Sequence, residues 1–252
     1  MPSFNKKRGV VRFSDTGAGG SSSVDPFKDD VTYCAIYQGE NGTGGGIVDM
    51  TGRHSRTLFN SPTTVSATKD FGVSSMQLTA ASSQGYSVAN SSDFHTTANG
   101  FTVDGIVRRD GVPGGGQYRT VIRMVDSVST TPFAVYIDSS GQFTVQLSAT
   151  SNGDLSGIST QRGALADTTF THFALVHDPG VEYRFYIGGS LAATIASTTA
   201  FDDGDGALQF GRYDSANYWN GQFQAIRITQ NVRYTGATLT VPGYIDYINS
   251  FV

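Results

Sequence analysis

Several kinds of residue are scarce in this chain, and each shortage excludes a class of protein. One of the 252 residues is a cysteine, so no disulfide can form within the chain, and we expect Cys34 to be a small buried side chain. No run approaches the ~20 apolar residues of a membrane-spanning helix. The first residues carry positive charge without an apolar signal segment. We therefore expect a soluble protein that is not secreted.

Glutamate is also scarce, with two residues in the chain, which bears on catalysis. Glycosidases place two carboxylates across the scissile bond, yet Glu40 and Glu182 are far apart and neither has a second carboxylate two or four residues further on. His172 and His177 lie five residues apart, on opposite faces of a predicted strand, so they cannot share a metal ion. His172 is expected to be structural. The sequence also lacks a Gly-x-Ser-x-Gly elbow and a phosphate-binding loop. These absences predict a protein that is not an enzyme.

Charge and periodicity define the fold class. The net charge of −4 is spread along the chain, which argues against nucleic acid as a partner. No window of helical length keeps an apolar stripe, so helix is expected only in short turns. Strict alternation instead places Phe101, Val103 and Val107 on one face of a strand and polar residues on the other, which predicts half-buried strands. Pairs such as Gly188-Gly189 and Asn220-Gly221 supply tight turns between strands.

The apolar phase of each alternation gives a predicted core. Two antiparallel sheets should face each other with these positions between them. The set consists of Phe101, Val103, Phe133, Val135, Val145, Leu147, Phe173, Leu175, Phe185, Leu208, Ile226 and Ile228.

The order of motifs in the last third of the chain is more specific. THFALVHDPGVEYRFYIGG (171–189), ALQFGRY (207–213) and WNGQFQAIRITQNVRYTG (219–236) follow one another, preceded by FTVDGIVRR (101–109). Together with VDPFKDDVTYCAIYQGENG (24–42) and GVSSMQLTAASSQGYSVANSSDF (72–94), this order resembles a laminin-G-like, concanavalin A-like lectin/glucanase domain. The resemblance implies an all-β jelly-roll sandwich of two antiparallel sheets. Thr171 and Gly188 depart from the Trp and Asp that are common in the family.

The two ends differ from this domain in composition. Residues 1–23 combine a basic and apolar segment with a Gly/Ser-rich linker and predict an arm, whereas residues 24–242 form the jelly roll and 243–252 an apolar tail. The tail either packs on its own domain or offers a second contact surface. The residues expected to bind a partner are Lys6, Lys7, Arg8, Val10, Val11, Arg12 and Phe13.

Two weaker signals concern ligands. Asp202, Asp203 and Asp205 are spaced like oxygen ligands, and laminin-G-like domains often hold one Ca²⁺, but a solvated turn is the simpler interpretation. The second signal is a group of aromatic side chains suited to stacking on a sugar, with neighbouring Asp and Asn side chains as hydrogen-bond partners. The alternative is that Tyr218 and Trp219 begin a strand and lie in the core. This group comprises Tyr213, Asp214, Asn217, Tyr218 and Trp219.

The resemblance, together with the missing disulfides and signal segment, points to domains of tailed-bacteriophage particles. We therefore expect a non-enzymatic virion protein, assembled in the host cytoplasm, that decorates or cements a capsid through its arm and contacts copies of itself. One alternative is a tail or baseplate adhesin that binds host glycans. Another is a cellular lectin-like module. No cofactor is expected beyond the candidate Ca²⁺.

Overall fold

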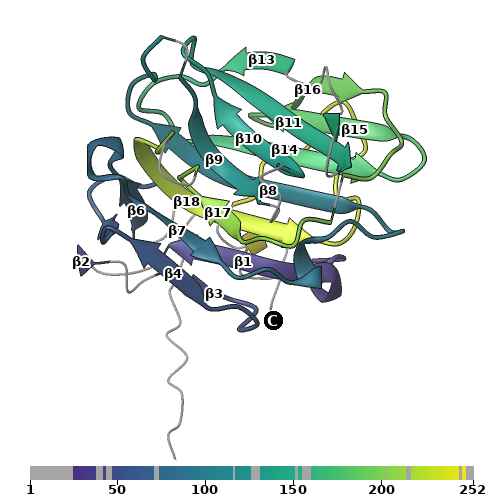
Figure 1. Cartoon of the computed structure of the whole chain (residues 1–252), viewed down its shortest axis with the longest axis horizontal. Helices are drawn as coiled ribbons and strands as arrows, with labels where there is room; N and C mark the ends of the chain where they lie inside the picture. The colour runs from purple at the N-terminus through teal and green to yellow at the C-terminus, as the bar shows by residue number, and fades with distance from the viewer. Residues whose placement is uncertain are drawn as a thin grey trace, which may run out of the picture.

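The computed structural model describes residues 25–37, 42–43, 47–70, 74–115, 117–125, 131–150, 153–154, 160–201, 203–213, 217–243 and 246–247. Over these ranges the chain forms two antiparallel sheets, with single-turn 3₁₀ helices η1 (Lys28–Asp30), η2 (Ala80–Ser82) and η3 (Ser92–Phe94). No helix in the described ranges is long and apolar enough to cross a membrane. The two-sheet arrangement (Figure 1) confirms the predicted all-β fold class.

The larger sheet has ten described strands in the order β16-β15-β14-β8-β18-β6-β5-β2, with β1 beside β18 and β3 beside β1. β18 pairs with β8 along one edge and with both β1 and β6 along the other. The strands are β1 (Val31–Tyr37), β2 (Gly42–Thr43), β3 (Ile47–Asp49), β5 (Thr63–Val65), β6 (Ser75–Leu78), β8 (Phe101–Arg109), β14 (Thr171–Asp178), β15 (Glu182–Ile187), β16 (Ser190–Ile195) and β18 (Gly221–Thr229).

The smaller sheet has eight described strands in the order β12-β11-β10-β9-β17-β7-β4, with β13 beside β11. Its central strand β9 pairs with β10 on one side and with β17 on the other, although β17 follows much later in the sequence. The strands are β4 (Arg56–Phe59), β7 (Gly85–Val88), β9 (Arg119–Met124), β10 (Phe133–Ile137), β11 (Gln142–Thr150), β12 (Gly153–Asp154), β13 (Thr160–Ala164) and β17 (Leu208–Phe210).

The core lies between the two sheets and confirms the predicted strand register. All twelve predicted core residues are buried in one hydrophobic cluster. Gly105 lies among them on β8, where an added Cβ would come within 2.5 Å of Ile226 and 3.1 Å of Phe173. The absence of a side chain at this position lets two large neighbours pack across the sheet.

The predicted Gly188-Gly189 turn is confirmed. Gly188 and Gly189 both have positive φ, +56° and +85°, in the tight connection between β15 and β16. This is the conformation that two-residue hairpin turns require. The Gly at the position where the family commonly has Asp therefore keeps a tight hairpin here.

The prediction of half-buried strands is wrong for the centre of the larger sheet. Every residue of β1 and β18 is buried, and Asp104 on the outer side of β8 is 0% exposed. The outer face is covered by the segment that follows β18, with Tyr234 and Tyr247 donating hydrogen bonds to the Asp104 carboxylate. The described part of the C-terminal tail thus packs on its own domain.

An ion pair with Arg227 compensates for the burial of the Asp104 carboxylate. Arg227 donates to both carboxylate oxygens of Asp104, at 3.0 and 2.9 Å, and His172 Nε2 lies 3.6 Å from the same group. Burial alone would raise the pKa of Asp104, but the attraction and hydrogen bonds of Arg227, with His172 close by, lower it well below its usual range. His172 therefore lies in a structural cluster, as the sequence predicts.

Candidate functional site

A hollow of about 350 Å³ lies on the outer face of the smaller sheet. On β10 and β11, Tyr136 and Thr144 alternate with inward residues such as Val135 and Val145, so they point away from the core. Loop residues complete the lining. We call this the tyrosine hollow, and its lining residues are Tyr118, Tyr136, Thr144, Gln146, Tyr213 and Asn217.

Backbone hydrogen bonds connect the described residues at both ends of the loop that contains Tyr213 and Asn217 to β9. The Gly211 amide donates to the Val121 carbonyl of β9 at 3.0 Å, and the Thr120 amide donates to the Asn217 carbonyl at 2.9 Å. Gly211 has φ of +70°, a conformation that glycine adopts without strain. Both ends of the loop are therefore tied to β9, directly beside Tyr118.

Three tyrosine rings form the apolar part of the tyrosine hollow. The ring centres of Tyr118 and Tyr136 are 5.8 Å apart, and those of Tyr136 and Tyr213 are 6.5 Å apart, each pair tilted by 48°. Arg123 supports the group, because its guanidinium lies 3.6 Å from the centre of the Tyr213 ring. Tyr118 is 43% exposed, so its ring remains accessible to a ligand.

Polar atoms stand beside these rings. The Tyr136 hydroxyl donates to Gln146 Oε1 at 2.9 Å, and burial, reinforced by Tyr213, raises the pKa of Tyr136, so its hydroxyl stays protonated. Thr144 Oγ1 is buried and has no hydrogen-bond partner among the described residues. An orphaned hydroxyl lining a hollow is a ready partner for a ligand hydroxyl or a water molecule.

A second hollow of about 290 Å³ adjoins the first, because Tyr118 and Asn217 line both. We call it the arginine hollow, after the one charged residue among its described lining residues. These are Ala80, Pro113, Gln117, Tyr118, Arg119, Asn217 and Tyr218.

The structure divides the five predicted sugar-binding residues. Tyr213 and Asn217 line the tyrosine hollow and Tyr218 lines the arginine hollow, whereas Trp219 is 0% exposed and packs against Phe223. Core burial, the simpler interpretation, is thus right for Trp219 and wrong for Tyr218, which is half-buried. Asp214 lies outside the described residues.

Two tyrosines of the tyrosine hollow, Tyr118 and Tyr136, are not among the residues predicted from the sequence. Tyr136 occupies the outward phase of the β10 alternation, so an aromatic residue at a solvent-facing strand position was the available signal. Tyr118 stands alone before β9. Its contact with Tyr136 depends on strand pairing that the local sequence does not contain.

The other predicted sites are not assembled by the described residues. Residues 1–24, which include all seven partner-binding positions of the arm, lie outside them, and so does Asp202 of the candidate Ca²⁺ set. Asp203 is exposed and lies 3.9 Å from His95 Nδ1. Within the described ranges no group of three metal-ligating side chains is found, so the arm and the three-aspartate set stay predictions.

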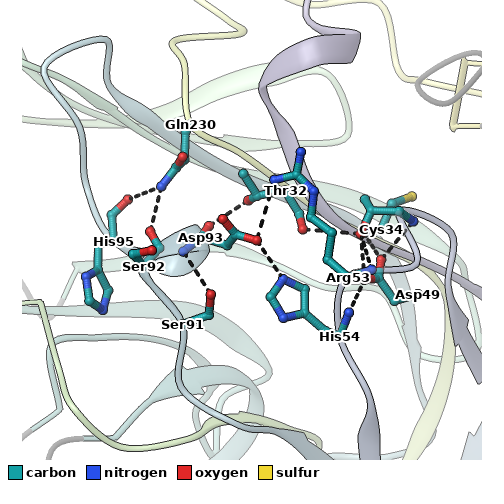
Figure 2. A network of polar contacts seen from close by, with 11 residues as sticks. Thr32, Cys34, Asp49, Arg53, His54, Ser91, Ser92, Asp93, His95 and Gln230 are labelled. Atoms are coloured by element: carbon teal, nitrogen blue, oxygen red, sulfur yellow. Dashed lines mark hydrogen bonds and ion pairs between the residues drawn. The ribbon is translucent and has the colours of Figure 1, made fainter.

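The polar network in Figure 2 lies in the loops just before β4 and just after β7. Asp49 accepts hydrogen bonds from the amides of Cys34, Thr51, Arg53 and His54, and His54 Nε2 lies 3.0 Å from Asp93. The carboxylates of Asp49 and Asp93 therefore form hydrogen bonds and ion pairs that stabilise these loops. Cys34 is 0% exposed, as predicted.

One pair of carboxylates does come together in space. Asp178 and Glu182 are cross-strand partners at the β14–β15 hairpin, and Arg184 pairs with both, at 2.8 and 2.7 Å. A glycosidase needs space for a sugar between its carboxylates. Here a guanidinium occupies that position.

The comparisons with known proteins agree with the fold. The sequence profile described as the concanavalin A-like lectin/glucanases superfamily matches residues 81–234. Similar solved structures include one of botulinum neurotoxin type C, which concerns its interaction with two ganglioside molecules. It has a TM-score of 0.62, 12% identity, and coverage of 83% of this chain and 50% of that chain. The chain thus spans about half the length of that toxin structure. A search of curated proteins finds no match.

Two further structures are of sugar-related proteins. Domain 4 of AbnA, a GH43 extracellular arabinanase from Geobacillus stearothermophilus, in complex with arabinotriose, has a TM-score of 0.59 and 13% identity over 81% of this chain and 93% of that chain. Trypanosoma rangeli sialidase in complex with sialic acid has a TM-score of 0.57 and 12% identity over 88% of this chain and 33% of that chain. The fold and its hollowed sheet face define a lectin-like β-sandwich. The chain belongs to the concanavalin A-like lectin/glucanases superfamily.

Proposed function

We propose that this protein is a non-catalytic carbohydrate-binding domain whose site is the tyrosine hollow. The observation that supports this most is the convergence of Tyr118, Tyr136 and Tyr213 around an orphaned hydroxyl, Thr144 Oγ1. Aromatic faces cover the apolar faces of sugar rings, while hydroxyl and amide groups bond the sugar hydroxyls. The similarity to a domain determined with arabinotriose supports the same assignment at the level of the fold.

Glycan binding is tested with the whole chain on a glycan array, followed by calorimetric titration of the best ligand. Tyr118→Ala and Tyr213→Ala should each weaken binding about tenfold or more, since buried aromatic anchors carry most of the affinity of such sites. Val181→Ala, at the exposed tip of the β14–β15 hairpin, is the matched control and should change nothing. Absence of any glycan ligand, or equal loss in all three variants, would refute the proposal.

The absence of catalysis is part of the same proposal. Since Arg184 pairs with both Asp178 and Glu182, these carboxylates are not available as acid and nucleophile. Incubation with β-glucans, arabinans and sialylated glycans should release no reducing sugar. Turnover that disappears in Glu182→Gln would show that this pair is catalytic.

The virion setting predicted from the sequence is a separate proposal about where the domain acts. Its support is the resemblance to phage-particle domains and the basic, apolar arm of residues 1–23. A glycan-binding face suits a tail or baseplate adhesin, and a decoration protein anchored by its arm could display the same face outward. Attachment through the arm and glycan binding by the sandwich are therefore tested independently.

A further inference from the structure

Among its described lining residues the arginine hollow carries one charge, the positive charge of Arg119. Arg119 Nη1 donates to the main-chain carbonyls of Asp110 and Gly111, at 3.3 and 3.1 Å. Among the described residues, Arg119 forms no ion pair with a carboxylate within 4.0 Å. The two nearby arginines differ in this respect.

Both neighbouring arginines are already paired. Arg108 lies 2.9 Å from the Asp110 carboxylate, and Arg109 lies 3.7 Å from Asp167. Burial, and then the like charge of Arg109, lower the pKa of Arg119, with Asp167 acting in the opposite direction. The side chain is thus held in place by neutral carbonyls and partly desolvated, conditions under which an anion is bound more strongly than in open solvent.

The two hollows are contiguous. Tyr118 and Asn217 contribute to both, so a chain of sugars lying on Tyr118 reaches the rings of Tyr136 and Tyr213 on one side and Arg119 on the other. No carboxylate appears among the described lining residues of either hollow to repel an acidic ligand. The charge pattern therefore favours a ligand that is neutral at one end and anionic at the other.

We propose that the two hollows form one groove for an acidic oligosaccharide, with a sugar ring stacked in the tyrosine hollow and a sugar carboxylate bound by Arg119. This inference rests on the proposed carbohydrate-binding function and names its ligand class. The carboxylate belongs to a uronic acid or to a sialic acid, which share the group that Arg119 recognises. A guanidinium binds a carboxylate through two parallel hydrogen bonds, a geometry that lysine cannot reproduce.

The test compares matched acidic and neutral probes by calorimetric titration of the full chain. Tetragalacturonate is paired with its carboxyl-reduced neutral counterpart, and sialyllactose with lactose, so the two arms distinguish the source of the carboxylate. At least one acidic probe should bind about tenfold more tightly than its neutral partner, since a charge-assisted bond is lost in the neutral probe. Galacturonic acid alone should bind more weakly than the tetrasaccharide.

Arg119→Gln should abolish the preference for the acidic over the neutral probe, while Arg119→Lys should retain part of that preference. Arg53→Gln serves as the control, because Arg53 is an exposed arginine in the loop before β4 and lines neither hollow. Raising the salt concentration should shrink the preference of the unmodified protein, a readout that needs no variant. Equal binding of acidic and neutral probes, or a preference that survives Arg119→Gln, overturns the inference and leaves the proposed function standing. Failure to bind any glycan refutes both.

Discussion

The guanidinium of Arg123 on β9 lies over the ring of Tyr213, 3.6 Å from its centre, and joins the centre of the smaller sheet to the loop before β18. The contact holds one face of the ring against the sheet. Tyr213 is therefore positioned before any ligand arrives, which reduces the entropy lost on binding.

This contact predicts a difference between two substitutions of Tyr213. Tyr213→Ala should lower the free energy of unfolding by about 1 kcal/mol, the usual size of a partly desolvated cation–π contact, whereas Tyr213→Phe should leave it nearly unchanged. Urea unfolding followed by tryptophan fluorescence measures both, because the single Trp219 lies in the core. Equal destabilisation by the two variants would assign the effect to the hydroxyl.

A second prediction concerns the buried pair of Asp104 and Arg227. Asp104→Asn removes the carboxylate that the buried Arg227 guanidinium bonds at both oxygens and leaves it with the more distant Asp25, at 3.7 Å, so the free energy of unfolding should fall by about 3–5 kcal/mol. The double change Asp104→Leu and Arg227→Met should cost less than this single change, because it removes both charges together. Asp203→Asn, at a side chain that is 54% exposed, is the control and should be neutral. Chemical unfolding of the natural protein and of these three variants measures the differences in unfolding free energy.

The same carboxylate predicts how stability depends on pH. The pKa of Asp104 is lower in the folded protein than the ordinary value of about 3.9. Its contribution to stability is therefore complete above that value and is lost progressively as the pH falls below it. The unfolding free energy of the natural protein should consequently decline more steeply between about pH 5 and pH 2 than that of Asp104→Asn. Parallel pH profiles for the two proteins would contradict this assignment.

Two glycines give a matched pair of predictions on packing. Gly105→Ala should destabilise the fold by about 1–3 kcal/mol, the usual effect of overpacking, because the new Cβ would meet the Ala225 carbonyl oxygen at 2.7 Å. Gly115→Ala places a Cβ where no atom lies within 4 Å and should be tolerated. Thermal unfolding of both variants measures the difference. A neutral Gly105→Ala would mean that β8 and β18 can separate without loss.

The alternation of apolar residues was sufficient to predict the core, since the side-chain period of a strand is a local property. It did not reveal the covered outer face of the larger sheet, because Asp104 and Arg227 look like solvent-facing residues until β8 and β18 pair. The candidate site was predicted only in part for a similar reason. Tyr118 and Tyr213 come together because β9 pairs with both β10 and β17, and such long-range pairing is set by the whole fold.

The last prediction tests the arm separately from the sandwich. Asp25, the first described residue, is buried and pairs with Arg233 at 2.6 Å, so deletion of residues 2–23 removes none of the described contacts. The shortened protein should therefore unfold at nearly the same temperature as the full chain. It should also keep its glycan affinity, because both hollows are formed by residues from Ala80 onward.

Deletion of residues 2–23 should affect attachment to a particle, in contrast to stability and glycan affinity. If Lys6, Lys7, Arg8 and Arg12 meet an acidic surface while Val10, Val11 and Phe13 supply apolar contact, the deletion should abolish co-sedimentation with capsids that lack the protein. Added salt should weaken attachment of the full chain only in part, because apolar contacts are not screened. A chain with the four basic residues changed to Gln separates the two contributions and should show no salt dependence. Undiminished attachment by the shortened protein would move the contact to the sandwich itself, and binding to host cells in place of capsids would favour the adhesin.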